Sequence, residues 1–200
     1  MFVKICGITH PDDARSAVAA GADAVGLNFV PTSRRFIDLA AAQVIVGAVP
    51  DHVMTVGIFH EHGLDEILEV LAVLDLKAAQ LHGDHAPDVN AAIRANVQTL
   101  ITVVVAGQAM SGPLDADDVV MVDAPNPGQG VPFDWGLVGD LVTKHKILLA
   151  GGLRPDNVSD AIRRVRPWGV DVATGVEAPD GRKDPNAIAR FVAAARTAMP

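Results

Sequence analysis

Two residues have side chains suited to acid–base chemistry and stand where short aliphatic runs give way to loops. Cys6, the only cysteine of the chain, precedes a Gly-containing turn, and Asp123 precedes a stretch rich in proline and glycine. A thiolate can act as a base, and a positioned carboxyl group can donate a proton. Each residue also has an ordinary explanation, because a buried cysteine often serves as a small hydrophobe and an aspartate can cap a loop. The elements around them decide between these interpretations.

The elements that could position these residues are aliphatic segments at spacings of roughly 20–30 residues, the rhythm of repeated βα units. Eight strands are predicted, over residues 3–8, 23–29, 54–59, 77–82, 99–105, 119–123, 146–151 and 169–174. Eight parallel strands favour a closed (βα)8 barrel, or TIM barrel, and we assign residues 1–200 to one α/β domain of this class. An open, doubly wound sheet is the alternative, but its usual G-x-G-x-x-G turn is missing from the first turn, CGITHPDD.

Helix signals occupy most segments between the predicted strands. Thr9 and Asp12 predict a capping pattern for the first helix, and Asp38 predicts the cap of the second. Residues 64–74 carry apolar side chains at helical spacing. The segment 106–118, AGQAMSGPLDADD, is short and contains two glycines and a proline, so we expect the fifth helix of the barrel to be short or missing.

Polar residues recur on one face of these strands, near their carboxyl ends. Strand residues two apart share a face, which in a barrel is the interior, and active sites of such barrels lie at the carboxyl ends. The residues on this face are Lys4, Cys6, Asn28, Gln80, His82, Asp123 and Asp171. Buried polar residues can also simply hydrogen-bond one another. For Lys4 and Asp171, whose strands become neighbours when a barrel closes, we predict an interior ion pair that holds the barrel closed.

The composition excludes several classes of function. A formal net charge of −8 argues against a nucleic-acid partner, because phosphate backbones are bound by clustered Lys and Arg. No apolar run is long enough to span a bilayer and we find no signal-peptide pattern, so we expect a cytoplasmic protein with no membrane partner. A small phosphate ester stays compatible with this charge, because backbone N–H groups can bind it.

Six segments together resemble the signature of one enzyme family. They are KICGIT (4–9), GLNFVPTSRRF (26–36), QLHG (80–83), VDAPNPGQGVPFDW (122–135), LAGGLRPDNV (149–158) and VDVATGVEAPDGRKDP (170–185). They occur in the order typical of phosphoribosylanthranilate isomerases, so the chain resembles this family from residue 4 to residue 185.

The resemblance implies a reaction that uses no cofactor and no metal. It is the Amadori rearrangement of N-(5′-phosphoribosyl)anthranilate to 1-(2-carboxyphenylamino)-1-deoxyribulose 5-phosphate, a step of tryptophan biosynthesis. In family members the cysteine that matches Cys6 takes the proton from the ribose C2, and the aspartate that matches Asp123 protonates the ring oxygen. A thiol of pKa about 8.5 is mostly protonated at neutral pH, so we expect the cationic intermediate or N–H groups of the first loop to lower the pKa of Cys6. For Asp123 we expect burial to raise the pKa.

The resemblance and the pattern of strand faces also predict which residues bind the substrate, a small phosphorylated molecule. They are Arg35, Asn28, Gln80, His82, Gly151, Gly152, Gly175 and Val176. Arg35 matches the arginine that holds the anthranilate carboxylate, and Arg34 is its rival. The phosphate should lie over the loops after the seventh and eighth strands, with Gly175 and Val176 at the start of a short extra helix. We expect a monomer.

Two segments depart from the family pattern. The family commonly shows Gly-Gly-Thr-Gly after the sixth strand, where this chain has Pro127, Gly128, Gln129 and Gly130. This puts in doubt the conformation of that loop and any substrate contact by Gln129. The family often shows Ser-Ser-Gly where this chain has Ala173, Thr174 and Gly175, and Thr174 keeps a hydroxyl group.

Three other functions compete with the isomerase. Four histidines fall in two loops, at His60, His62, His82 and His85, and histidine clusters bind divalent metals. A metal-dependent sugar-phosphate epimerase would fit them, although the second strand offers Asn28 and no histidine. A bifunctional isomerase acting also on a histidine-pathway aminoaldose phosphate would need an aspartate where Cys6 stands. A phosphate-binding barrel without activity is the third, opposed by the joint presence of Cys6, Asp123 and Arg35.

Overall fold

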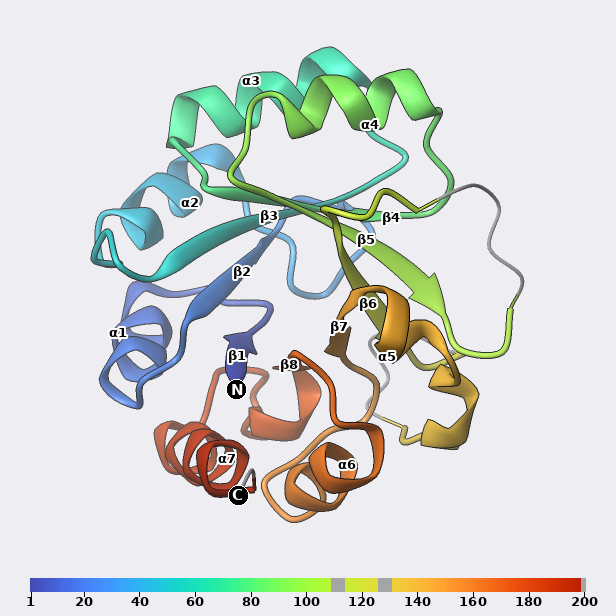
Figure 1. Ribbon diagram of the computed structural model, residues 1–200. Helices are drawn as coiled ribbons and strands as arrows, with labels where there is room; N and C mark the ends of the chain where they lie inside the picture. Colours follow the sequence, from blue (N-terminus) through green and yellow to red (C-terminus); the bar gives the residue numbers. More distant parts are fainter. Residues whose placement is uncertain (109–113, 126–130, 199–200) are drawn as a thin grey trace.

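In the computed structural model, residues 1–108, 114–125 and 131–198 are described, and they form a closed barrel of eight parallel strands (Figure 1). The strands are β1 Phe2–Ile5, β2 Ala24–Asn28, β3 Met54–His60, β4 Ala78–His82, β5 Thr99–Val105, β6 Val119–Asp123, β7 Lys146–Leu149 and β8 Gly169–Val172. They follow chain order around the barrel, and β8 pairs with β1. The predicted class and all eight predicted strands are confirmed.

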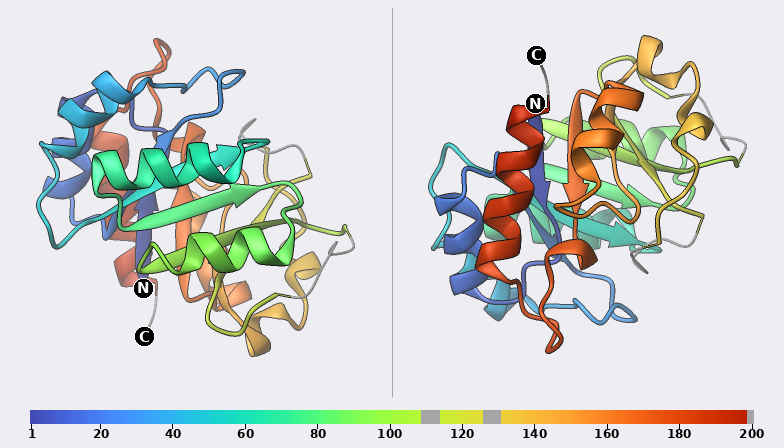
Figure 2. Two further views of the ribbon diagram at one scale, coloured as in Figure 1. Left: turned by 90° about the horizontal axis from the view of Figure 1, so that it is seen from above. Right: turned by 90° about the horizontal axis from the view of Figure 1, so that it is seen from below.

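Helices surround the barrel, as the views in Figure 1 and Figure 2 show. They are α1 Pro11–Ala19, α2 Leu39–Val46, α3 Leu64–Leu74, α4 Pro87–Arg94, α5 Leu141–Lys144, α6 Val158–Val165 and α7 Pro185–Thr197, with the 3-10 helices η1 Trp135–Val138 and η2 Thr174–Val176. Between β5 and β6 the described residues, 106–108 and 114–118, form no helix. This agrees with the predicted short or missing fifth helix; residues 109–113 lie outside the described part.

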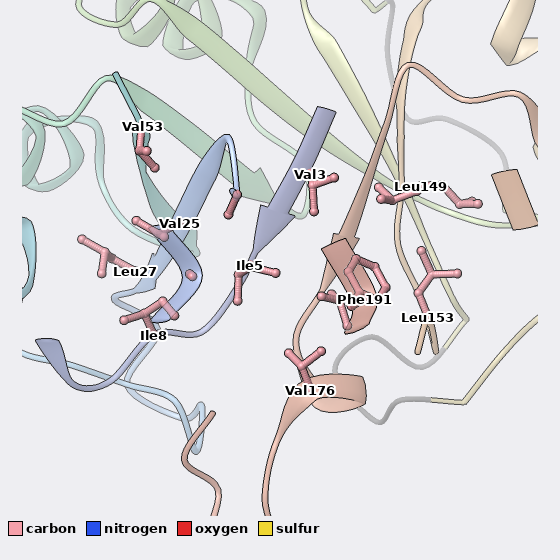
Figure 3. Packing of buried hydrophobic residues seen from close by; sticks show 14 of the residues in the cluster. Val3, Ile5, Ile8, Val25, Leu27, Val53, Leu149, Leu153, Val176 and Phe191 are labelled. Carbon is pink, nitrogen blue, oxygen red and sulfur yellow. The ribbon is translucent and has the colours of Figure 1, made fainter. Parts of the chain in front are cut away.

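The barrel has two apolar layers because strand side chains alternate in direction. Val3 and Ile5 of β1 are fully buried between the strands and the helices, in the layer that also contains Phe191 of α7 (Figure 3). The inner layer is smaller and includes Ala24, Val56, Ala78, Ile101 and Leu148. Lys4 lies between Val3 and Ile5 in sequence, so its side chain points into the barrel.

The sequence predicts the caps of two helices, and the structure agrees with one prediction and not with the other. The Asp38 carboxylate accepts a hydrogen bond from the N–H of Ala41 at 2.8 Å, so the predicted cap of α2 is confirmed. The predicted capping pattern of α1 with Thr9 is wrong. His10 is the cap residue, and its Nδ1 accepts from the N–H of Asp12 at 3.2 Å. Pro11 is the first helical residue and places the cap one position later than expected.

The predicted ion pair between the first and last strands is confirmed. Lys4 and Asp171 are partners in the β1–β8 register, and Lys4 Nζ lies 2.8 Å from Asp171 Oδ1. Lys4 is 0% exposed and also donates to Gln80 Oε1 at 2.8 Å. Burial would lower the pKa of Lys4, but Asp171 and Cys6 raise it, so the amine keeps its charge.

Removing one partner of this pair should strongly destabilise the barrel. Asp171→Ala leaves the Lys4 ammonium buried without its counter-charge, so we expect a loss of about 3–5 kcal/mol in the free energy of unfolding, measured by urea denaturation. Lys4→Met with Asp171→Leu should recover most of this loss. The control is Arg163→Ala, which removes an exposed pair with Asp160 and should change stability by less than about 1 kcal/mol. If Asp171→Ala cost no more than this control, the pair would not hold the barrel closed.

Candidate active site

A cavity of about 910 Å³ opens at the carboxyl-terminal ends of the strands. The predicted site residues that line it are Cys6, Asn28, Arg35, Gln80, His82, Asp123, Gly151, Gly152 and Gly175. Val176 is the exception. Its side chain is fully buried in the apolar layer, which Figure 3 shows, and its N–H contacts the carbonyl of Ala173 at 3.5 Å. The cavity therefore brings together residues that are far apart in the sequence.

Cys6 follows β1 and enters the cavity wall from the barrel interior. Its backbone N–H donates to the Val172 carbonyl at 2.8 Å, which fixes the residue against β8. Burial raises the pKa of the Cys6 thiol, while the positive charges of Lys4, Lys183 and Arg35 act in the opposite direction. The expected lowering of this pKa is therefore wrong for the protein without a ligand, because desolvation of the thiolate outweighs the nearby cations.

Asp123 is the last residue of β6 and is 8% exposed. Burial raises its pKa to about 6, although the N–H of Ala124, which donates to Oδ1 at 2.7 Å, acts to lower it. The predicted raised pKa is confirmed. A carboxyl group with such a pKa holds its proton in mildly acidic solution and is suited to proton donation.

Arg35 is fixed by a buried carboxylate that the sequence reasoning did not identify. Arg35 Nε donates to Glu177 Oε1 at 2.6 Å, and its Nη2 donates to Thr174 Oγ1 at 2.8 Å. Glu177 also binds the exposed Arg34 at 2.5 Å and the buried Lys183 at 3.0 Å. The segment VDVATGVEAPDGRKDP carries Glu177 and Lys183, but its spacing gives no signal that Glu177 binds both Arg35 and Lys183.

This network connects the loops after β2 and β8 through charge. Burial alone would raise the pKa of Glu177, but the hydrogen bond from Arg35 and the charge of Lys183 outweigh it and lower that pKa. Burial lowers the pKa of Lys183, and Glu177 opposes this shift. Glu177 therefore stays ionised and holds Arg35 at the cavity wall.

The loop after β7 contacts the loops after β6 and β8 through glycines. A Cβ atom added at Gly175 would lie 1.9 Å from the Leu153 carbonyl oxygen. A Cβ atom added at Gly152, where φ is +68°, would lie 2.2 Å from Pro132 N. Only glycine fits such close backbone contacts. Helix η2, Thr174–Val176, is the short extra helix that was predicted here. The cavity wall at this point is therefore backbone, which can present N–H groups to an anion.

The remaining polar site residues bind the protein itself. Asn28 Oδ1 accepts from the N–H of Val30 at 2.9 Å. Gln80, which is 2% exposed, accepts from Lys4 at its amide oxygen, and its amide nitrogen lies 2.9 Å from His82 Nε2. Both ends of the Gln80 amide are thus occupied.

The histidines near the mouth are engaged in loop contacts. The His62 ring nitrogens lie 2.8 Å from the His60 carbonyl oxygen and 3.1 Å from that of Phe29, and His85 Nε2 donates to the His82 carbonyl at 3.1 Å. In the described part of the chain, no three His, Cys, Asp or Glu side chains are placed to share a metal ion. The altered loop at 127–130 lies outside the described residues.

Comparison with known proteins agrees with this geometry. Residues 3–194 match the family model of N-(5′-phosphoribosyl)anthranilate (PRA) isomerase. An N-(5′-phosphoribosyl)anthranilate isomerase from Thiobacillus denitrificans is 42% identical over 202 residues, which cover 97% of each chain. Among the described residues, no helix has the length and apolar character needed to cross a membrane.

Solved structures of the same family have the same fold. Phosphoribosyl anthranilate isomerase from Thermotoga maritima superposes with a TM-score of 0.88 at 36% identity, over 98% of both chains. A phosphoribosyl anthranilate isomerase in complex with reduced 1-(o-carboxyphenylamino)-1-deoxyribulose 5-phosphate gives 0.85 at 34% identity, again over 98% of both chains. Family model, sequence identity and fold agree over nearly the whole chain, and the chain therefore belongs to the N-(5′-phosphoribosyl)anthranilate isomerase family.

Proposed function

We propose that this isomerase converts N-(5′-phosphoribosyl)anthranilate to 1-(2-carboxyphenylamino)-1-deoxyribulose 5-phosphate in tryptophan biosynthesis, with Asp123 as general acid and Cys6 as general base. The observation that supports this most is that both residues line one cavity, where the carboxyl group has a pKa of about 6. We further propose that the enzyme acts in the cytoplasm as a monomer, without a cofactor.

The reaction needs two proton transfers in this cavity. Asp123 donates a proton to the ribose ring oxygen as the bond from that oxygen to C1 breaks, and the nitrogen lone pair forms an iminium cation. The Cys6 thiolate then takes the proton from C2, which gives an enaminol. Loss of the O2 proton and gain of a proton at C1 give the ketone. The iminium charge favours the thiolate beside it, which offsets the effect of burial on Cys6.

The two anionic groups of the substrate have separate partners. We infer that Arg35 binds the anthranilate carboxylate, because a guanidinium group has five N–H donors and Glu177 and Thr174 engage only its Nε and Nη2. For the phosphate, we propose a subsite in the part of the cavity that the backbone of Gly151, Gly152 and Gly175 lines. The relative solved with a reduced phosphorylated product analogue supports a substrate of this class.

Replacing the proposed base should abolish most turnover. Cys6→Ala should lower kcat by roughly 10²–10⁴-fold, the usual contribution of general acid–base catalysis. Cys6→Ser should not restore it, because a serine hydroxyl does not ionise in this pH range. The measurement is a steady-state assay with the anthranilate substrate in buffer containing a chelator, alongside thermal denaturation to establish that the fold is intact. Near-normal turnover in Cys6→Ala would assign the base elsewhere.

Asp123→Asn should change the pH dependence as well as the rate. In the wild type, kcat/KM should rise with pH up to about 6 and then level, because above the Asp123 pKa each gain in thiolate is offset by a loss of carboxylic acid. Asparagine cannot donate the proton, so kcat/KM should fall by roughly 10²–10⁴-fold and rise steadily through pH 6. A variant that keeps the bend near pH 6 would show that another group titrates there.

The two neighbouring arginines should differ in their effect on substrate binding. Arg35→Ala should raise KM by roughly 10- to 100-fold, the worth of a charge-assisted hydrogen bond, with a smaller change in kcat. Arg34→Ala is the matched control. Its side chain is exposed and also binds Glu177, so we expect a change of no more than roughly threefold. Equal effects of the two substitutions would contradict the assignment of Arg35.

A further inference from the structure

A chain of hydrogen bonds crosses the barrel interior from β8 to β4. Lys4 Nζ donates to Asp171 Oδ1 and to Gln80 Oε1, each at 2.8 Å, and Gln80 Nε2 lies 2.9 Å from His82 Nε2. In a barrel of eight strands in chain order, β4 stands opposite β8, as Figure 1 shows. The chain therefore begins at an ion pair on one side of the barrel and ends at a histidine on the other.

The donors and acceptors in this chain can be arranged in only one way. An ammonium group has donors alone, so the Gln80 amide must turn its oxygen toward Lys4 and its NH2 group toward His82. An NH2 group is also a donor, so His82 Nε2 must accept. The single proton of the neutral ring then belongs to Nδ1. An imidazolium would place two donors against each other at 2.9 Å.

The surroundings of His82 agree with a neutral ring. Burial lowers the pKa of His82 to about 4, and the positive charge of Lys4 acts in the same direction. With Nε2 already accepting a hydrogen bond and the pKa this low, the ring is poorly suited to act as a base or to bind a metal. Its remaining polar group is the Nδ1–H, and among the described residues none is recorded as accepting from it.

We infer that His82 donates its Nδ1–H to an uncharged oxygen of the substrate sugar, a hydroxyl or the carbonyl that forms from it, and that Gln80 is a positioning residue which fixes this tautomer. The choice of substrate oxygen rests on the proposed function. The carboxylate and the phosphate already have partners on the loops after β2, β7 and β8, whereas His82 lines the cavity at the end of β4. A neutral donor suits an oxygen whose charge changes little.

The tautomer can be measured without any assay of activity. Long-range 1H–15N spectra of the labelled protein at pH 7 should show a protonated Nδ1 and an unprotonated Nε2 for His82, identified among the seven histidines by its loss in His82→Asn. Gln80→Glu should invert this pattern, because a carboxylate only accepts and requires a proton on Nε2. Gln80→Met, which removes both amide groups, should leave a mixture of the two tautomers. A wild-type ring protonated at Nε2, or a Gln80→Glu ring unchanged from the wild type, would overturn the inference.

Kinetics test whether the substrate uses this donor. His82→Ala should lower kcat/KM by roughly tenfold, the larger end of the range for one neutral hydrogen bond. His82→Asn can place an amide N–H near the position of Nδ1 and should recover most of this loss, whereas Gln80→Glu should lose as much as His82→Ala. The control is His85→Gln, a nearby loop histidine outside the cavity lining, which should retain wild-type kcat/KM.

The outcomes separate the inference from the proposed function. Full kcat/KM in His82→Ala would show that the donor is not used, even with the expected tautomer. A wild-type protein with no isomerase activity would refute the proposed function and the substrate oxygen with it, while the spectra would still decide whether Gln80 fixes the ring.

Discussion

The burial of one ammonium group inside a closed barrel is the constraint on which the rest of the structure depends. Lys4 has no contact with solvent, so its charge must be balanced and its donors satisfied within the interior. Its partners are Asp171 on the last strand, β8, and Gln80 on β4, which stands opposite β8. The same contacts that satisfy the lysine therefore join the first strand to the last, orient a polar chain across the barrel and place a positive charge beside Cys6.

Burial affects the two proposed catalytic groups in the same direction, although the reaction needs opposite forms of them. It raises the pKa of both Asp123 and Cys6. This suits an acid that must hold its proton and opposes a base that must lose one. The cations of Lys4, Lys183 and Arg35 around the thiol partly offset this effect, and the cation formed during the proposed reaction would supply the remainder. The pKa values of Cys6 and Asp123 therefore depend on desolvation and local charge together.

A second buried charge network fixes the mouth of the cavity. Glu177 binds Arg34, Arg35 and Lys183, so two loops that are 142 residues apart at Arg35 and Glu177 act as one wall. The backbone contacts at Gly152 and Gly175 hold the neighbouring loops together in the same region. These contacts leave the arginine oriented before any ligand arrives, which reduces the entropy lost on binding.

The sequence by itself determined the barrel, its eight strands, the interior pair of Lys4 and Asp171, and the cysteine and aspartate at the strand ends, because strand period and strand order are local or nearly local properties. Only the tertiary structure decided that Glu177 binds both Arg35 and Lys183, that Val176 is buried away from the cavity, that the Gln80 amide binds the protein, and that the thiol pKa is raised. Each of these depends on distances between residues remote in the chain and on the depth of burial. Hydrogen-bond partners and desolvation are set by three-dimensional packing, and residue spacing along the chain does not encode them directly.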